Sequence, residues 1–331
     1  MKQYQPKLDY FKTQKAIKFA KDTFERKLAE KLSLIRVSAP RFLHVSKEVD
    51  KGLQDDLAGT QMPVSFSTKF SDCVEIVHSL AKWKRFTLGK YGFTVGTGLY
   101  TDMDAIRKDE DVSEIHSIYV DQWDWEKVIS KDQRRIDFLK YKVELIYEAL
   151  LETEQLVQEK FGLTKRLPPK ISFVTTQKLE DRFPSLTPKE REHAISQELG
   201  AVFLIGIGHE LKSGKIHDLR AADYDDWKLC GDIVVWDDIR KKSLELSSMG
   251  IRVDSESLRK QLKFLGLESR EQLEFHQGII EDTIPLSIGG GIGQSRICMF
   301  LLHKAHIGEV QASVWPEEFV QQCKTCKIEL L

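Results

Sequence analysis

Segments that alternate like β-strands are mixed irregularly with long amphipathic helices in this chain, and this pattern restricts the fold more than any other feature. Apolar side chains recur at three- and four-residue steps over residues 13–31 and 132–161, as they do in helices that pack one face on a core. Residues 187–190, TPKE, have the form of a capping box, which predicts a helix ending at Gly200. Strands are expected over 74–77, 115–120, 170–175, 201–207, 232–236, 243–253 and 310–314.

The order of these segments decides between two classes of sheet. A doubly wound parallel sheet requires a regular strand–helix–strand rhythm, and this chain does not follow one. We therefore predict an α+β fold: a single large domain over residues 1–331, with a mostly antiparallel sheet flanked by helices.

Composition restricts the environment and the partners. The 331 residues include 50 Lys+Arg and 51 Asp+Glu, and the resulting net charge of −1 offers no general attraction to nucleic acid or to an anionic membrane. No stretch approaches the roughly 20 apolar residues that span a bilayer. The five scattered cysteines favour a reducing compartment, and the Cys323/Cys326 pair lacks the further ligands of a zinc site. We expect a cytoplasmic protein that binds neither nucleic acid nor membrane.

A glycine-rich run, GGGIGQSR, occupies residues 289–296 and precedes an apolar helix. Its glycines allow a ligand to approach the backbone closely, and the Arg296 guanidinium offers a planar fork for phosphate or carboxylate. The run lacks the glycine spacing and strand–helix context of a dinucleotide site, and it lacks the Lys-Ser/Thr of a P-loop. It is therefore a candidate ligand site of another kind.

Charged residues gather in two other places. Residues 107–110, RKDE, precede a predicted strand, and taken alone they would be a solvated turn. The second group is the acidic segment 223–226, followed by Asp232 and Glu245 on separate predicted strands. Mg²⁺ bound to nucleotide phosphates takes one or two carboxylates from the protein, which Asp232 and Glu245 can supply together. The alternative is a set of solvated loop acids, which fits Asp223 and Asp226 better than Glu245.

Taken in order, these clusters resemble the catalytic core of class II aminoacyl-tRNA synthetases. Arg107 and Glu110 form an Arg-x-x-Glu motif before a strand, an acidic strand follows, and a glycine-rich strand then ends in an arginine before a helix. The helix and proline over residues 13–40 resemble the first motif of that family, which forms dimers. The resemblance therefore implies a homodimer, with residues 1–40 at its interface.

The resemblance extends to the family of ammonia-dependent asparagine synthetases. It is carried by five blocks spread over nearly the whole chain: HSLAKWKR (78–85), YVDQWDWE (119–126), DYDDW (223–227), ELSSMGIRVD (245–254) and IGGGIGQSR (288–296). The connection from Trp227 to Asp232 is several residues shorter than is usual in the family. We interpret it as a mobile loop of which part is missing from the sequence, the alternative being a clipped loop.

The family implies ATP-dependent synthesis of L-asparagine from L-aspartate and ammonia, through β-aspartyl-AMP, with release of pyrophosphate and AMP. Mg²⁺ is the implied cofactor, held by Asp232 and Glu245. The implied aspartate-binding residues are Asp55, Ser79, Lys84, Gln122, Ser248 and Arg296. The implied nucleotide-binding residues are Arg107, Glu110, Asp232, Glu245, Arg252, Gly293 and Arg296.

Some roles stay open at this stage. Arg107 is expected to bind the α-phosphate and the activated carboxylate, whereas Arg296 binds either the γ-phosphate or a substrate carboxylate. The proton of ammonia goes to a carboxylate, for which Asp225 ranks before Asp124 and Asp55. Two other hypotheses are a paralogue that charges or binds tRNA and a catalytically inactive scaffold.

Overall fold

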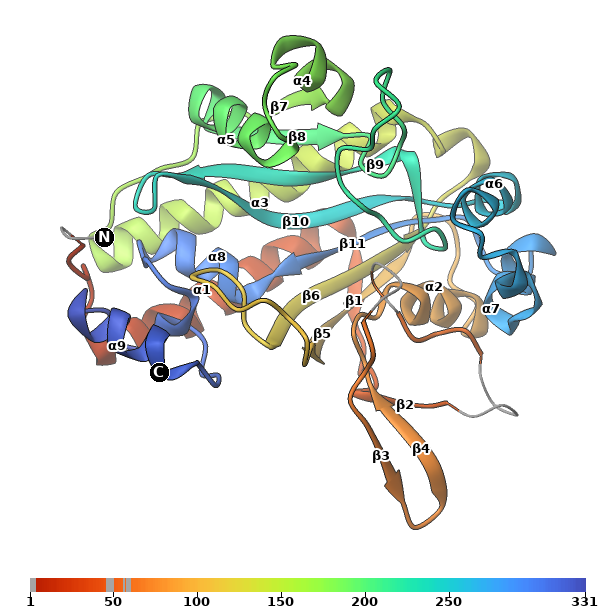
Figure 1. The fold of residues 1–331 in the computed structure, drawn as a ribbon, viewed down its shortest axis with the longest axis horizontal. Coiled ribbons are helices and arrows are strands. Elements are labelled where there is room, and N and C mark those ends of the chain that lie inside the picture. The colour runs from red at the N-terminus through yellow and green to blue at the C-terminus, as the bar shows by residue number, and fades with distance from the viewer. Residues whose placement is uncertain (1–3, 46–50, 56, 58–60) are drawn as a thin grey trace.

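An eight-stranded sheet lies at the centre of the computed structural model, which describes residues 4–45, 51–55, 57 and 61–331 (Figure 1). In spatial order its strands are β1 (Leu34–Arg36), β5 (Gly98–Ile106), β6 (Tyr119–Val128), β11 (Ser287–Gly293), β10 (Lys242–Arg252), β9 (Asp225–Asp237), β8 (Ala201–Ile205) and β7 (Ser172–Thr175). Neighbouring strands from β5 to β8 are antiparallel, and only the two edge pairs are parallel. The predicted α+β fold with a mostly antiparallel sheet is confirmed.

Two long helices, α1 (Tyr10–Leu32) and α3 (Ile136–Phe161), lie behind the sheet in the view of Figure 1. Gly162 adopts the left-handed conformation that ends α3, as the sequence predicted. Between these helices and the sheet lies the main core, which includes Phe24, Leu28, Leu139, Val143, Trp123, Trp125, Met249 and Ile292. Because strand side chains alternate between the two faces, this apolar face leaves the polar face of β6, β10 and β11 in front.

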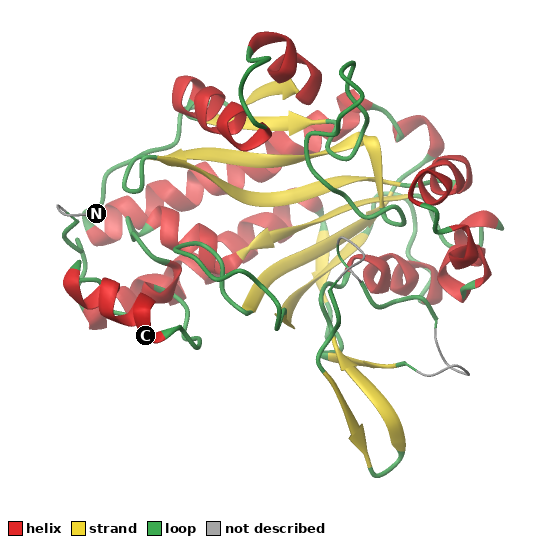
Figure 2. Cartoon of the chain, viewed as in Figure 1, coloured by secondary structure: helices red, strands yellow, loops and turns green. Residues whose placement is uncertain are grey.

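Shorter helices surround the sheet (Figure 2). They are α2 (Ala81–Lys90), α4 (Thr176–Arg182), α5 (Pro188–Leu199), α6 (Ser255–Leu265), α7 (Glu274–Ile280), α8 (Gln294–Leu301) and α9 (Glu317–Thr325). Thr187 and Glu190 form the predicted capping box of α5, and Gly200 ends it at a φ of 76°. A second sheet, β2 (Phe42–His44), β4 (Ser71–Ile76) and β3 (Ser65–Thr68), projects from the body of the molecule.

Two predicted strands are wrong in extent or in kind. The strand expected over 115–120 begins only at Tyr119 and continues to Val128, because Ser113 and His116 close a turn before it. Residues 310–314 form no strand: Val310 follows a short 3₁₀ helix, Ile307–Glu309, and Gln311 turns its amide toward Asp121 and Ser295. No helix in the described part of the chain is long and apolar enough to cross a membrane.

The short connection from Trp227 to Asp232 is part of a strand and not a mobile loop. Cys230 of β9 stands opposite Gly250, and Asp225 stands opposite Arg252, so that residues 226–229 face a single residue of β10. This arrangement is a large β-bulge, which keeps Asp225 in the sheet. The expectation of a mobile loop at this position is therefore wrong.

Candidate active site

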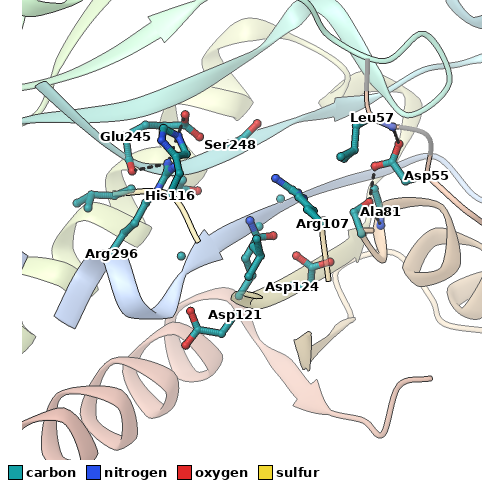
Figure 3. Close-up of a pocket in the computed structure, with 18 of the residues that line it drawn as sticks. Asp55, Leu57, Ala81, Arg107, His116, Asp121, Asp124, Glu245, Ser248 and Arg296 are labelled. Carbon is teal, nitrogen blue, oxygen red and sulfur yellow. Dashed lines mark hydrogen bonds and ion pairs between the residues drawn. The ribbon is translucent and has the colours of Figure 1, made fainter. Parts of the chain in front are cut away.

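A cavity of about 350 Å³ opens on the front face of the sheet, opposite the helices α1 and α3 (Figure 3). Thirteen of the fourteen residues implicated by sequence line it: Asp55, Ser79, Lys84, Arg107, Glu110, Gln122, Asp124, Asp225, Glu245, Ser248, Arg252, Gly293 and Arg296. The exception is Asp232. Residues from the N-terminal third and the C-terminal third of the chain therefore meet in one site.

The sheet register sets a row of four residues across the floor of this cavity. Asp124 of β6 stands opposite Gly291 of β11, which stands opposite Ser248 of β10, which stands opposite Asp232 of β9. Adjacent strands lie about 4.8 Å apart, so the row is roughly 14 Å long. Gly291 keeps its middle open, because a Cβ there would lie 2.2 Å from Oε1 of Gln122 and 2.8 Å from Oδ1 of Asp124.

Asp55, Ser79 and Lys84 form one end of the cavity. Ser79 donates to Oδ2 of Asp55 at 2.5 Å, and the backbone N–H of Leu57 donates to Oδ1 at 2.9 Å. Lys84 is 1% exposed; its ammonium donates to the carbonyl of Gly290 at 2.9 Å and lies 3.3 Å from Asp124. Burial lowers the pKa of Lys84, although Asp124 partly opposes this. Lys84 is therefore not the surface charge that its Lys-Trp-Lys-Arg context suggests.

Beneath this end lies a buried group of three charges. The guanidinium of Arg252 donates to both oxygens of Glu126, with the shortest contact at 2.8 Å, and to Oδ1 of Asp225 at 2.5 Å. Burial alone would raise the pKa of Glu126, but Arg252 lowers it below its usual value. Ser287 adds a hydrogen bond to Glu126 at 2.7 Å. Arg252 therefore fixes Asp225 and Glu126 in place, and its guanidinium is already occupied by carboxylates.

Arg107 lies over the middle of the row (Figure 3). It follows β5 directly, and its backbone N–H donates to the carbonyl of Ile118 at 2.8 Å. Its guanidinium has one long contact, 3.4 Å to the carbonyl of His78, and its buried Nε has no hydrogen-bond partner. No carboxylate among the described residues pairs with it. Arg107 is thus a half-buried cation available to a ligand.

Glu245, Arg296 and His116 lie together at the other end of the cavity, away from Asp55 (Figure 3). Arg296 donates to the backbone carbonyl of Glu245 at 3.1 Å and lies 3.6 Å from its carboxylate. Burial, followed by the charge of Arg296, lowers the pKa of His116 to about 4, so this histidine is neutral at physiological pH. Gly293 precedes α8, and the carboxylate of Asp121 accepts from the Ser295 N–H at the start of that helix.

Asp232 stands at the end of the row, but Arg220 covers it. The Arg220 guanidinium donates to Oδ1 of Asp232 at 2.6 Å and also to Oγ of Ser248. Burial raises the pKa of Asp232 to about 7; Arg220 opposes this shift, and the charge of Glu245 adds to it. Asp232 and Glu245 lie on the adjacent strands β9 and β10, where Asp232 stands opposite Ser248 and Glu245 stands opposite Val234.

Sequence reasoning missed Arg220, Glu126 and His116. Arg220 is an isolated basic residue in a connection between strands, a context with no signal for a site. Glu126 and His116 stood beside or within the quoted motifs, yet only the fold shows that one lies under Arg252 and the other beside Arg296. No group of three or more His, Cys, Asp or Glu suited to a metal occurs among the described residues.

Solved structures identify the class of protein that this fold defines. Asparaginyl-tRNA synthetase from Pyrococcus horikoshii, in complex with asparaginyl-adenylate, superposes with a TM-score of 0.66 over 92% of this chain and 70% of its own, at 14% identity. Asparaginyl-tRNA synthetase from Entamoeba histolytica gives a TM-score of 0.64 over 90% of this chain and 66% of its own, also at 14% identity. The fold is that of a class II aminoacyl-tRNA synthetase core.

The sequence comparisons identify the family within that class. The aspartate–ammonia ligase family model matches residues 11–327. Aspartate–ammonia ligases of Bacillus cytotoxicus and Levilactobacillus brevis are 55% and 54% identical, and each alignment covers 99% of this chain and at least 98% of the relative. The chain belongs to the aspartate–ammonia ligase family. It is a ligase that joins aspartate and ammonia, the reaction that forms asparagine.

Proposed function

We propose that this ligase works in two steps on one site. In the first, an oxygen of the aspartate side-chain carboxylate attacks the α-phosphorus of ATP, giving β-aspartyl-AMP and pyrophosphate. In the second, ammonia attacks the acyl carbon, AMP leaves with the electron pair of the broken C–O bond, and a proton leaves the nitrogen. The observation that carries the proposal is Arg107, which pairs with no carboxylate among the described residues and lies over a row with a carboxylate at each end.

The row supports one placement of the two substrates. Aspartate would lie at the end with Asp55, Ser79 and Lys84, where its ammonium meets carboxylates and its carboxylate meets an ammonium. Gln122 would contact aspartate from β6. The nucleotide would lie toward Ser248, Glu110 and Glu245.

Arg296 belongs to the nucleotide end. It lies beside Glu245 and far along the cavity from Asp55 (Figure 3), which favours the γ-phosphate over a substrate carboxylate as its partner. Gly293, one turn before it, allows the nucleotide to approach the end of β11. Arg252 contributes indirectly, because it holds Asp225 beside the aspartate.

Arg107 would act at the reacting centre. An anionic carboxylate must approach an anionic phosphate, so charge builds up on the oxygens around the α-phosphorus. A planar guanidinium can donate to two of these oxygens at once. Because no carboxylate in the described part of the chain pairs with Arg107, it can stabilise the transition state without breaking an ion pair seen there.

Three carboxylates remain candidates for the proton of ammonia: Asp225, Asp124 and Asp55. The first two face cations, Arg252 at 2.5 Å and Lys84 at 3.3 Å, and a base loses such stabilisation when it takes a proton. The described contacts of Asp55 are to neutral donors. Asp55 lies where the substrate ammonium is placed, so all three carboxylates would face a cation in the loaded site, and Asp225 stays the first candidate.

The nucleotide needs a divalent cation here. The cavity is lined by five cationic side chains against six carboxylates: Lys84, Arg107, Arg220, Arg252 and Arg296 against Asp55, Glu110, Asp121, Asp124, Asp225 and Glu245. ATP and aspartate add further negative charge that these residues do not neutralise. Asp232 and Glu245, on the adjacent strands β9 and β10, would offer the one or two hard oxygen ligands that Mg²⁺ takes when phosphates supply others. Mg²⁺ bound there would neutralise the triphosphate.

The remaining expectations are part of the same proposal. Residues 1–331 would act as one catalytic domain in the cytoplasm. The homodimer would form through α1 and β1, where Phe11 is 75% exposed and Ile35 is 58% exposed. Sedimentation analysis of the native protein and of an F11E/I35E variant tests this interface; an unchanged dimer in the variant would contradict it.

Product analysis tests the chemistry. Purified protein is supplied with aspartate and MgATP, and with either ammonium or glutamine, and the products are identified by mass spectrometry. We expect asparagine with equimolar AMP and pyrophosphate, dependent on ammonium. ADP with phosphate would instead indicate an acyl-phosphate intermediate and refute the adenylate.

The role of Arg107 is tested separately by R107A. We expect aspartate-dependent exchange of pyrophosphate into ATP to fall by at least about 10²-fold, the usual scale for one lost transition-state donor. R182Q removes an arginine from the exposed ion pair with Glu198, away from the cavity, and serves as the matched control. Exchange at the native rate in R107A would contradict the assignment.

A further inference from the structure

Arg220 lies at the nucleotide end of the cavity, on the connection between β8 and β9 that passes in front of the sheet (Figure 1). Its side chain is only 11% exposed. One arm of the guanidinium donates to Oδ1 of Asp232 at 2.6 Å, and the other donates to Oγ of Ser248. Arg220 therefore binds the last two residues of the row and separates Asp232 from the cavity.

This contact is incompatible with a metal ion on the same carboxylate oxygen. Mg²⁺ binds oxygen at about 2.0–2.1 Å, and a guanidinium that already occupies Oδ1 of Asp232 both blocks that approach and repels the ion. Glu245 is not covered in this way, since its neighbour Arg296 lies 3.6 Å from the carboxylate. Of the two proposed ligands, Asp232 is therefore the one that is blocked in this arrangement.

The chain around Arg220 permits the side chain to move. Its connection is held at several points: Gly206 accepts from Thr176, His217 contacts Glu192, and Asp223 pairs with Lys82. Between these points, no hydrogen bond in the described part of the chain joins the backbone of residues 218–220 to another element. A short span can therefore reorient while the strands on both sides stay in place.

We propose that the Arg220 guanidinium pairs with Asp232 in the empty enzyme, where the divalent cation would bind. When the metal–nucleotide complex binds, the guanidinium releases Asp232 to the metal and pairs with the phosphates instead. The inference rests on the proposed function, because it takes Asp232 and Glu245 as the metal carboxylates. In the empty site the guanidinium neutralises Asp232. When the metal takes Asp232, the guanidinium keeps its position near Ser248 and binds phosphate oxygens with its planar fork.

The exchange predicts that removing Arg220 exposes a metal site in the absence of nucleotide. Mn²⁺, a probe for Mg²⁺ that is visible by electron paramagnetic resonance, is titrated into native protein, R220Q and the control R182Q without ATP. We expect the Kd for Mn²⁺ to fall at least tenfold in R220Q and to stay unchanged in R182Q. An unchanged Kd in R220Q, in protein that retains the native circular dichroism spectrum, would overturn the inference.

R220K separates the two roles of the arginine. Lysine keeps the charge but lacks the planar fork, so we expect Mn²⁺ binding without ATP to stay close to native while pyrophosphate exchange falls at least tenfold. Native exchange in R220K would mean that Arg220 does not contact the phosphates. D232N tests the underlying assignment: if it binds MnATP as tightly as the native protein, the proposed metal site itself is wrong.

Discussion

Replacing Gly291 with alanine tests the placement of aspartate directly. The new Cβ would lie 2.2 Å from Oε1 of Gln122 and 2.8 Å from Oδ1 of Asp124. An ordinary contact needs about 3.4 Å or more, so the ends of both side chains must shift, Gln122 by more than about 1 Å. Both are flexible side-chain ends, and we therefore expect the variant to fold, at an overpacking cost of roughly 1–3 kcal/mol.

The size of the functional loss follows from the contact that is displaced. A hydrogen bond to a charged group contributes about 1.5–3 kcal/mol. At about 1.4 kcal/mol for each factor of ten, losing one such bond lowers kcat/KM for aspartate roughly 10- to 150-fold. The effect should appear chiefly as a raised KM for aspartate. AMP release at varied aspartate, then at varied ATP, measures both constants, and thermal unfolding confirms the fold.

Gly293, on the same strand and the same face but at the nucleotide end, offers a comparison variant. A Cβ there would lie 3.3 Å from Cβ of Arg296, a contact that a shift of a few tenths of an ångström relieves. Because Gly293 is placed beside the nucleotide, we expect G293A to raise the KM for ATP, whereas at saturating ATP its kcat/KM for aspartate should stay within about threefold of native, less than one tenfold step of 1.4 kcal/mol. A folded G291A with native kcat/KM would refute the placement of aspartate beside Gln122 and Asp124. Equal losses in both variants would show that the strand, and not this contact, is sensitive.

Two further predictions concern stability. R252M leaves Glu126 and Asp225 buried without their cation, and we expect the free energy of unfolding to fall by about 3–5 kcal/mol near pH 7. In the native protein Arg252 depresses the pKa of Glu126, which adds to the free energy of unfolding. This contribution is fully present above the pKa that Glu126 has in the unfolded chain, and it is lost as the pH falls through the lower pKa of the folded protein. In R252M burial instead raises that pKa, so denaturant titrations from pH 8 to pH 5 should show the two proteins converge; a constant difference would refute this reasoning. T187A removes the cap of α5 and should cost about 1 kcal/mol without changing kcat, and a loss of activity would show that α5 does more than support β8.

The class of the fold was predictable because its signals are local. The capping box at Thr187 and the ends of α3 and α5 at Gly162 and Gly200 depend on a few neighbouring residues, and each is confirmed. The segment 310–314 shows the limit of such signals. It alternates like a strand, but Val310 packs in a small cluster beside α1 and α8, a contact that depends on the whole fold.

The start of β9 was not predictable for a similar reason. The acidic run at 223–226 has no strand pattern. It joins the sheet because Gly250 of the partner strand leaves room: a Cβ there would lie 2.6 Å from Cβ of Cys230 and 2.7 Å from Oδ1 of Asp225. The sequence shows that glycine, but it does not show which residues will stand next to it in the sheet.

The candidate site was predictable where motifs marked it and not elsewhere. Thirteen of fourteen implicated residues line one cavity, yet their chemistry alone would have left Lys84 on the surface. Lys84 is buried because α2 lies against β11, where the carbonyl of Gly290 accepts from it. Arg220 had no motif, since its partner Asp232 is reached only through the fold.

Strand β6 carries polar residues of the cavity face and core-facing residues in strict alternation, with Trp123 and Trp125 between Gln122, Asp124 and Glu126. Inserting or deleting one residue within it would turn both tryptophans toward the cavity and two carboxylates into the core. Such a change would abolish folding and activity together, whereas a substitution can affect one alone. Changes in chain length should therefore be excluded from β6, β10 and β11 in related enzymes and collect at the bulge of residues 226–229, which stands outside the ladder.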